Sequence, residues 1–272
     1  QIYGGLEILT GVASAEERRR LEHRLVSFLA PSESFSAGRY AQLAHHEIDS
    51  LLERGARPLV VGGTGLYLRA ALADLAMRPP PPLGVRERLL DRLRAEGPRA
   101  LHGELARAAP ALAAPIDPND RQRIVRTLEL LESAPERALA QAGRSGASQL
   151  WTAEMRHRTL LAGLIMERAA LYARIDARVD EMVGAGAIDE VRRAARGGAG
   201  PSARKALGFA ELLAGDVEAM KRRSRNYARR QLTWMRKLAG VQMYEVGALG
   251  VEECAAAIAA DAGYGRPRAP GA

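Results

Sequence analysis

The stretch that decides the fold is PLVVGGTGLY, residues 58–67, in which an apolar run meets two glycines, a threonine and a third glycine. A short buried strand that leads through a glycine turn into a helix presents backbone N–H groups to phosphates in α/β proteins. We therefore expect a strand at 59–61, a glycine turn, and a helix at about 65–75; the turn is either a nucleotide loop, a structural corner, or the partner of a phosphate loop elsewhere. Because the turn holds no lysine, it lacks part of a complete phosphate-binding loop.

Helices and short apolar strands alternate N-terminal to this stretch. Ser14 and Glu17 form a capping-box pattern that begins one helix. LVSF at 25–28 predicts a short strand. Ser36 begins a longer helix that Gly55 ends. Such alternation predicts a parallel sheet flanked by helices.

The middle of the chain reads as helical only. After the proline run 79–82 the pattern predicts helices at 85–96 and 98–108, then a third helix with Asp117 as its N-cap. A Gly/Ser/Ala stretch at 142–149 ends this region. We therefore expect an α/β core domain at 1–82 and 150–262, a helical insertion domain at 83–149, and a disordered tail at 263–272.

Strand and helix patterns return in the last part of the chain. TLLAGLIM at 159–166 predicts a strand, and a helix at 167–183 follows. Asp216 is the expected N-cap of a helix that reaches about Leu238. VQMYEV at 241–246 supplies a late strand, so the core is expected to combine distant segments.

The charge of the chain is concentrated in one segment. The 272 residues carry a net charge of +8, and residues 201–240 alone hold ten Lys/Arg and three Asp/Glu. No apolar stretch approaches the ~20 residues that cross a bilayer. One cysteine and five scattered histidines do not form a zinc-ligand pattern. We expect a cytoplasmic protein without membrane attachment and no metal ligands in this chain.

The helix expected after Asp216 has a strongly basic face. Eight basic residues and no acidic residue lie between Lys221 and Lys237, and Arg222, Arg229 and Arg236 recur every seven positions. A solvated surface is one interpretation, but such helices usually interleave acids. A face of this kind repels itself unless an anion lies on it, which favours a nucleic acid backbone over lipid.

A second basic group follows DPND in the insertion. Arg123 and Arg126 are one turn apart and share a helix face, and Gln122 beside them can hydrogen-bond a base or a phosphate. The alternative, that Asp120 and Glu129 neutralise these arginines, is equally compatible with the spacing.

Several motifs in a fixed order resemble those of the tRNA dimethylallyltransferases. They are GGTGLY at 62–67, DPNDRQRIVRTLE at 117–129, KALGF at 205–209 and RRQLTWMRK at 229–237, and the opening QIYGG resembles the end of that family's DSxQxY segment. The similarity runs from Gln1 to about Val246. It implies a P-loop NTPase-like parallel sheet flanked by helices, with the first strand, the phosphate loop and the DSxQ aspartate upstream of Gln1.

The resemblance also implies an activity. A dimethylallyl group would pass from dimethylallyl diphosphate to the exocyclic amine of the adenosine 3′ of a tRNA anticodon. The upstream loop and Mg²⁺ would stabilise the pyrophosphate, and the upstream aspartate would take the amine proton. We therefore expect a monomeric enzyme of which these 272 residues alone are inactive or nearly so.

Site residues follow from the same resemblance. Thr64 and Arg86 would lie at the reaction centre. The glycines on the diphosphate side would be Gly62, Gly63 and Gly65. The residues that would hold the tRNA anticodon arm are Gln1, Gln122, Arg123, Arg126, Arg204, Lys205, Gly208, Arg229, Arg230, Gln231, Trp234 and Arg236.

The chain departs from the family pattern at LTGVA, residues 9–13, where relatives commonly carry GTAKP. Val12 replaces the lysine and leaves any phosphate contact of that lysine unassigned. Two alternatives stay open. One is an adenylate isopentenyltransferase that prenylates a free nucleotide, and the other is an RNA-binding relative without catalysis.

Overall fold

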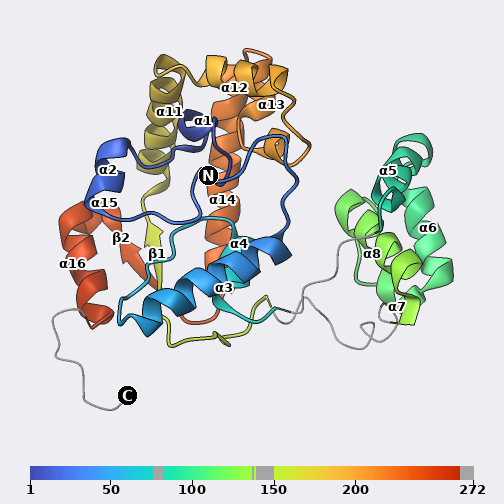
Figure 1. Cartoon of the computed structure of the whole chain (residues 1–272), viewed down its shortest axis with the longest axis horizontal. Helices are drawn as coiled ribbons and strands as arrows, with labels where there is room; N and C mark the ends of the chain where they lie inside the picture. The colour runs from blue at the N-terminus through green and yellow to red at the C-terminus, as the bar shows by residue number, and fades with distance from the viewer. Residues whose placement is uncertain (76–81, 137, 139–149, 264–272) are drawn as a thin grey trace. The chain divides into compact units, whose positions relative to one another are not determined.

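The computed structural model describes residues 1–75, 82–136, 138 and 150–263, and the chain divides into two compact units (Figure 1). The first unit combines Gln1–Asp74 with Ala153–Ala272, and the second is Leu75–Thr152. Two of the segments expected to mark domain boundaries, 79–82 and 142–149, lie mostly or wholly outside the described residues, as does nearly all of the expected tail.

The first unit combines a small parallel sheet with many helices. Its strands are β1 (Leu161–Ile165) and β2 (Val241–Glu245), paired in parallel with Leu161 opposite Val241. This confirms the two strands expected at 159–166 and 241–246. The helices are α1 (Glu7–Thr10), α2 (Ala15–Arg20), α3 (Ala37–Glu53), α4 (Gly65–Leu72), α11 (Arg168–Gly184), α12 (Ala187–Arg196), a 3₁₀ turn η1 (Ala203–Lys205), α13 (Phe209–Leu213), α14 (Val217–Lys237), α15 (Val246–Leu249) and α16 (Val251–Asp261).

Local capping signals are confirmed at three helix starts. The Ser14 hydroxyl accepts from the Glu17 N–H while the Glu17 carboxylate accepts from the Ser14 N–H, which begins α2. The Ser36 side chain caps α3, and the Asp216 carboxylate caps α14 by accepting from the N–H of Ala219. These contacts involve residues three positions apart, so the sequence alone suffices to place them.

Two expected strands are absent from the structure. In segment 25–28, Leu25 and Ser27 have positive φ values of 56° and 52°, which are incompatible with a strand. Segment 59–61 is not a strand either, and Leu59 and Val61 are 73% and 81% exposed. A strand exists through its hydrogen-bonded neighbour. No described segment pairs with 59–61, so its apolar residues stay uncovered.

A buried carboxylate ties α1 to α12 inside the main core of the first unit. The oxygens of Glu190 accept hydrogen bonds from the backbone N–H groups of Ile8 and Leu9 at 3.0 and 2.7 Å. Glu190 is only 4% exposed. Because α1 has no side-chain cap of its own, this carboxylate from a distant helix satisfies the free N–H groups of its first turn.

The segment that re-enters the first unit is held by ionic contacts. The guanidinium of Arg156 contacts the Asp49 carboxylate at 3.2 and 2.9 Å, and its Nε lies 3.2 Å from Asp74. His157 Nε2 lies 2.7 Å from the same Asp49 carboxylate. Hydrogen bonds from Arg156 and then His157 lower the pKa of Asp49 to about 2. The segment is also joined to α4 by the Arg156 N–H, which donates to the Leu72 carbonyl.

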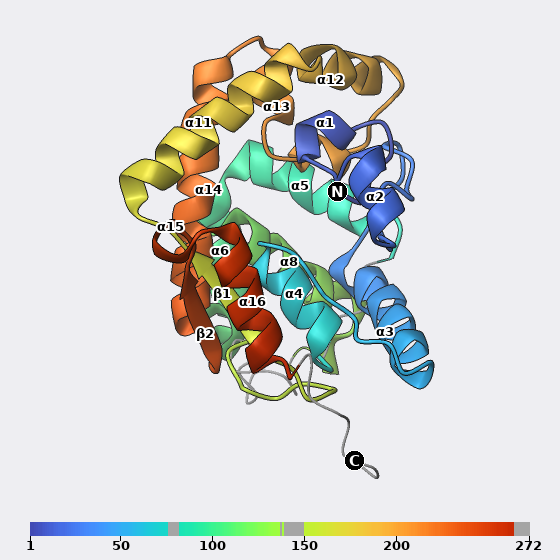
Figure 2. The same cartoon turned by 90° about the vertical axis from the view of Figure 1, so that its left-hand side faces the viewer.

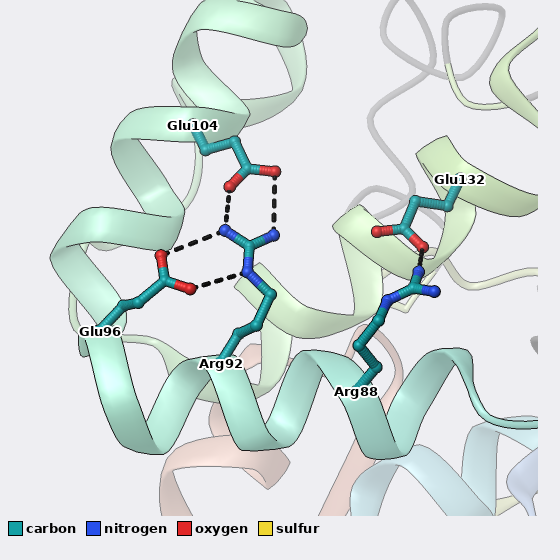
Figure 3. A network of polar contacts seen from close by, with 5 residues as sticks. All are labelled: Arg88, Arg92, Glu96, Glu104 and Glu132. Atoms are coloured by element: carbon teal, nitrogen blue, oxygen red, sulfur yellow. Dashed lines mark hydrogen bonds and ion pairs between the residues drawn. The ribbon is translucent and has the colours of Figure 1, made fainter.

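The second unit is built from helices in its described part. They are α5 (Val85–Glu96), α6 (Pro98–Ala108), α7 (Pro110–Ala113) and α8 (Arg121–Ser133), and the first two match the expected bounds. Leu89, Leu101, Leu105, Ile124 and Leu128 form their shared core. On the surface, the Arg92 guanidinium lies between Glu96 and Glu104 while Arg88 pairs with Glu132 (Figure 3). These ion pairs join α5 to α6 and α8.

The expected cap of the DPND helix was wrong by three residues. The Asp117 carboxylate accepts from the Asn119 N–H at 2.7 Å, which makes a turn ahead of the helix. Asp120 is the true N-cap, since its carboxylate accepts from the Arg123 N–H at 3.1 Å. Two aspartates three residues apart offered competing caps, and the first closed a local turn instead.

None of the helices in the described ranges is both long and apolar enough to pass through a lipid bilayer.

Replacing Glu190 by alanine should destabilise the first unit. The N–H groups of Ile8 and Leu9 would lose their acceptor, which costs about 1–3 kcal/mol for each group, so we expect about 2–6 kcal/mol in total. Urea unfolding followed by circular dichroism measures the change. The control is Asp189→Ala on the same helix, whose exposed carboxylate pairs with Arg192. Equal urea midpoints for the two variants would contradict this role of Glu190.

Candidate functional site

The glycine turn before α4 is hydrogen-bonded to helix α14 through a side chain. Thr64 occupies the N-cap position of α4, but its side chain makes no capping hydrogen bond to that helix. Its Oγ1 lies 2.7 Å from the phenol oxygen of Tyr227 on α14. The threonine hydroxyl is therefore directed toward a neighbouring helix rather than into its own.

Two glycines of the turn allow α14 to come close. A Cβ atom added to Gly63 would lie 1.8 Å from Nε2 of Gln231, and one added to Gly65 would lie 1.9 Å from Cε3 of Trp234. Both distances are far inside van der Waals contact, so any larger residue would displace α14 side chains. Tyr227, Gln231 and Trp234 follow at steps of four and three, which puts them on one helix face.

This arrangement bears on the expectation that Gln231 and Trp234 hold RNA. Both side chains are partly buried and lie against the glycine turn. The assignment to RNA stays a prediction, and the structure adds a packing role. Tyr227 was missed as a site residue, because nothing in its local sequence indicates that its hydroxyl meets a threonine 163 positions away.

The basic surface of α14 is smaller than expected. Lys221 pairs with Asp180 at 2.7 Å and Arg225 with Asp176 at 2.6 Å, both on α11, which runs alongside α14 (Figure 2). Arg223 pairs with Glu211 of α13 at 2.5 Å. Acids on two other helices therefore neutralise these three basic residues, a pairing that the charge pattern of α14 by itself does not show.

The C-terminal half of α14 keeps three exposed arginines. Arg229, Arg230 and Arg236 form no ion pair with any carboxylate in the described part of the chain. Arg229 donates to the Asn226 side chain at 3.1 Å. The guanidinium carbon of Arg230 lies 5.6 Å from the centre of the Tyr227 ring, a cation–π distance. These three residues are the candidate anion-binding surface of this unit.

Other expected RNA contacts have structural partners. The Gln1 amide donates to the carbonyls of Thr10 and Gly11 at 3.1 and 3.0 Å. Arg204 donates to the Ala199 carbonyl at 2.8 Å and lies over the ring of Phe209.

The two expected RNA contacts within the KALGF motif, Gly208 and Lys205, differ in burial. Gly208 has a left-handed φ of 89°, and a Cβ there would lie 2.8 Å from the side chain of Met220. The glycine is therefore required by its backbone conformation and its packing. Lys205 is exposed to solvent. Its proposed role in RNA binding stays a prediction.

In the second unit, one buried carboxylate organises two of the expected site residues. Glu129 has a fully buried side chain and pairs with Arg86 at 2.6 Å and with Arg126 at 2.8 Å. Burial of one carboxylate is offset by two guanidinium groups. Glu129 therefore neutralises Arg126, as the alternative to RNA contact in the sequence analysis supposed.

The other two residues of the basic group on α8 are more accessible. Arg123 is exposed, and its Nε lies 3.4 Å from the Asp120 carboxylate, a contact that the exposed surface weakens. Gln122 is exposed. Of the basic group that follows DPND, Gln122 and Arg123 thus present the most accessible polar atoms.

An arginine lies beside the segment in which Val12 replaces the lysine of the family pattern. Gly11 adopts a left-handed φ of 60°, and a Cβ there would lie 2.4 Å from Nη2 of Arg178 on α11. The guanidinium of Arg178 therefore lies against the backbone next to Val12. No local sequence pattern indicates that an arginine so far along the chain reaches this segment.

Within the described residues, no three His, Cys, Asp or Glu side chains gather in a way that could hold a metal ion.

Replacing Gly65 by alanine should displace Trp234. The added Cβ would overlap the indole ring, so the tryptophan must leave its position against the turn. We expect a red-shifted tryptophan emission in a Trp151→Phe background, where Trp234 is the sole tryptophan. Gly184→Ala is the matched control, because a Cβ at Gly184 meets nothing within 4 Å. An unshifted spectrum for the Gly65 variant would show that the indole does not rest on the turn.

The chain is similar to known proteins over most of its length. The family model described as IPP transferase matches residues 1–238. A tRNA dimethylallyltransferase of Thermomicrobium roseum is 37% identical over 90% of this chain and 76% of its own length. A relative of the same description from Rhodospirillum centenum is 41% identical over 91% of this chain and 81% of its own.

Solved structures show the same relationship. The full-length tRNA isopentenylpyrophosphate transferase of Bacillus halodurans aligns with a TM-score of 0.66 at 32% identity, covering 97% of this chain and 85% of that one. A eukaryotic dimethylallyltransferase described as acting on tRNA aligns with a TM-score of 0.74 at 24% identity, covering 98% and 72%, which supports the fold alone. The extent of the family match, together with relatives above 30% identity, shows that this chain belongs to the IPP transferase family.

Proposed function

We propose that the protein prenylates tRNA, moving a dimethylallyl group from dimethylallyl diphosphate to the exocyclic amine of the adenosine 3′ of the anticodon. The observation that carries the proposal is that one helix, α14, both contacts the glycine turn and presents exposed arginines. Thr64 in the glycine turn is held by α14, and the same helix exposes Arg229, Arg230 and Arg236 without carboxylate partners. The relatives named tRNA dimethylallyltransferase favour this reading.

The three arginines would bind the phosphate backbone of the anticodon arm. Their charges are unpaired within the described residues, and phosphate groups are strong acceptors for guanidinium. The accessible Gln122 and Arg123 of the second unit would add contacts to the same arm. Loop nucleotides are already partly unstacked, so drawing an adenine out of the loop costs less than it would in a duplex.

The chemistry needs help at both reacting ends. An exocyclic amine is a weak nucleophile, since its lone pair is delocalised into the ring. In the proposed site the Thr64 hydroxyl hydrogen-bonds across the reaction channel, beside the upstream aspartate that takes the proton of the amine. The backbone N–H groups of the turn face the diphosphate, where negative charge grows as the bond to the prenyl group breaks.

We further propose a P-loop NTPase-like core whose diphosphate-holding half and catalytic aspartate come from polypeptide outside these 272 residues. The exposed Leu59 and Val61 support this, because an adjacent strand would cover such an apolar run. The proposal includes a monomeric, cytoplasmic enzyme that takes Mg²⁺ through that other half.

The activity is tested with a fusion that carries the proposed diphosphate-holding half. A fusion places the phosphate-loop segment of the Thermomicrobium roseum relative ahead of Gln1 and is incubated with dimethylallyl diphosphate and Mg²⁺. We expect prenylated adenosine in tRNA by mass spectrometry, little product from AMP, and background levels from the 272-residue chain alone. Preferential turnover of AMP would favour an adenylate isopentenyltransferase. RNA binding without any prenyl transfer would favour a non-catalytic relative.

The RNA surface can be tested on the 272-residue chain itself. With three arginines on phosphates of a partly single-stranded loop, the slope of log affinity against log salt should be about −2, from about −0.7 per contact. Each of Arg229→Gln, Arg230→Gln and Arg236→Gln should make the slope shallower by about 0.7. Fluorescence anisotropy with a labelled anticodon stem–loop measures both quantities.

Arg192→Gln is the matched control for these variants, because it removes one exposed arginine charge from α12, away from the proposed RNA surface. Its slope should equal that of the unmodified chain. A salt-independent affinity of the unmodified chain would contradict the proposed RNA surface.

A further inference from the structure

We propose that Tyr227 is a positioning residue: it sets the side-chain orientation of Thr64 and couples that orientation to occupancy of Arg230. The coupling to RNA rests on the proposed function, whereas the hold on Thr64 does not. Three observations meet at this tyrosine. Its phenol oxygen lies 2.7 Å from Thr64 Oγ1, its ring lies under the Arg230 guanidinium at 5.6 Å, and it shares a helix face with the residues packed on Gly63 and Gly65.

The Thr64 hydroxyl has two competing partners. A threonine at an N-cap ordinarily turns its hydroxyl back to accept from an N–H in the first turn of its own helix. Here that contact is not made, and the hydroxyl meets Tyr227 instead. In the proposal, the capping orientation and the orientation toward α14 correspond to different staggered χ1 rotamers of Thr64. The Tyr227 hydroxyl therefore selects one of two discrete orientations.

The choice matters for the proposed reaction. In the capping orientation the Thr64 hydroxyl would accept from a backbone N–H of α4. In the orientation toward α14 it lies beside the glycine turn. Thr64 is exposed in the structure, so its oxygen can take a further partner while Tyr227 holds it. Tyr227 itself need not touch the substrate to have this effect.

Arg230 links the Thr64–Tyr227 contact to the candidate anion-binding surface. Of the three exposed arginines on α14, Arg230 is the one whose guanidinium lies on the Tyr227 ring. A phosphate bound to Arg230 would reposition the guanidinium over the ring and change the electrostatic environment of the phenol. Because α14 packs through Gln231 and Trp234 on the turn, a small shift at residue 230 is carried to Thr64 by the same rigid helix.

Threonine-methyl NMR on the whole 272-residue chain tests the proposal. The chain contains six threonines, so a spectrum labelled at threonine methyl groups is sparse, and Thr64→Ser assigns the signal of interest. The χ1 rotamer of Thr64 is read from three-bond couplings, first in the free chain and then with an anticodon stem–loop RNA. The variants are Tyr227→Phe, which removes only the hydroxyl, and Arg230→Gln, which removes only the cation.

In the free chain, Tyr227→Phe should move the Thr64 rotamer population by about fivefold toward the capping orientation, the effect of one hydrogen bond of ordinary net strength. Arg230→Gln should leave it unchanged. Thr233, whose hydroxyl donates to the Arg229 carbonyl on the same helix, is the internal control and should not respond to Tyr227→Phe. An unchanged Thr64 rotamer in the Tyr227→Phe protein would overturn the hold of Tyr227 on Thr64.

With RNA, the unmodified chain should show a shift of the Thr64 methyl signal that falls by about threefold or more in either variant, as expected when a coupling of ordinary size is lost. The RNA affinity of Tyr227→Phe should stay within about twofold of that of the unmodified chain, since the tyrosine is not a phosphate contact. An RNA-induced shift that survives in Arg230→Gln would overturn the coupling. If RNA does not bind the unmodified chain, the proposed function fails while the free-state comparison still decides the role of Tyr227.

Discussion

The structure of the first unit depends on close approach between α14 and the glycine turn ahead of α4. Gly63 and Gly65 carry no side chain where Gln231 and Trp234 come closest, and Cβ atoms there would lie inside those side chains. Interiors are packed too tightly to absorb such an overlap without moving a whole element. Through this contact one helix touches the turn on one face and presents arginines on another. The glycine turn and the candidate RNA surface are thus linked through one helix, α14, which contacts the first and presents the second.

Charge placement separates the two halves of α14. Acids from α11 and α13 neutralise the residues near its start, including Lys221 and Arg225, and thereby fasten the helix to its neighbours. Toward its end, no carboxylate of the described chain pairs with Arg229, Arg230 or Arg236. A gradient of this kind leaves these three positive charges at the end of the helix that also contacts the glycine turn.

Buried carboxylates organise regions where several elements meet. Glu190 serves the backbone N–H groups of α1, and Glu129 serves two guanidinium groups in the second unit. In each case one desolvated charge is satisfied by several donors, an arrangement that is sensitive to loss of a partner. Arg86 and Arg126 are held through Glu129, so any role they have with a substrate starts from a fixed orientation of their guanidinium groups.

What the sequence by itself determined about this protein is mostly local. The capping contacts at Ser14, Ser36 and Asp216 involve neighbours three residues apart, so their residue types were sufficient. The periodic helices 85–96 and 98–108 and the two apolar strands of the sheet were also predictable. Order and identity of the motifs pointed to the family. The DPND turn shows the limit of this reasoning, since Asp117 and Asp120 carry the same local signal and only one caps the helix.

Only the tertiary structure decided the features that join distant segments. Whether 59–61 forms a strand depends on a neighbouring strand, and whether the basic helix repels itself depends on acids of α11 and α13. The partner of Thr64 lies 163 residues away on α14. The physical reason is common to all three: a hydrogen bond, an ion pair or a strand pairing acts between groups brought together in space, and sequence periodicity records only which face a residue occupies.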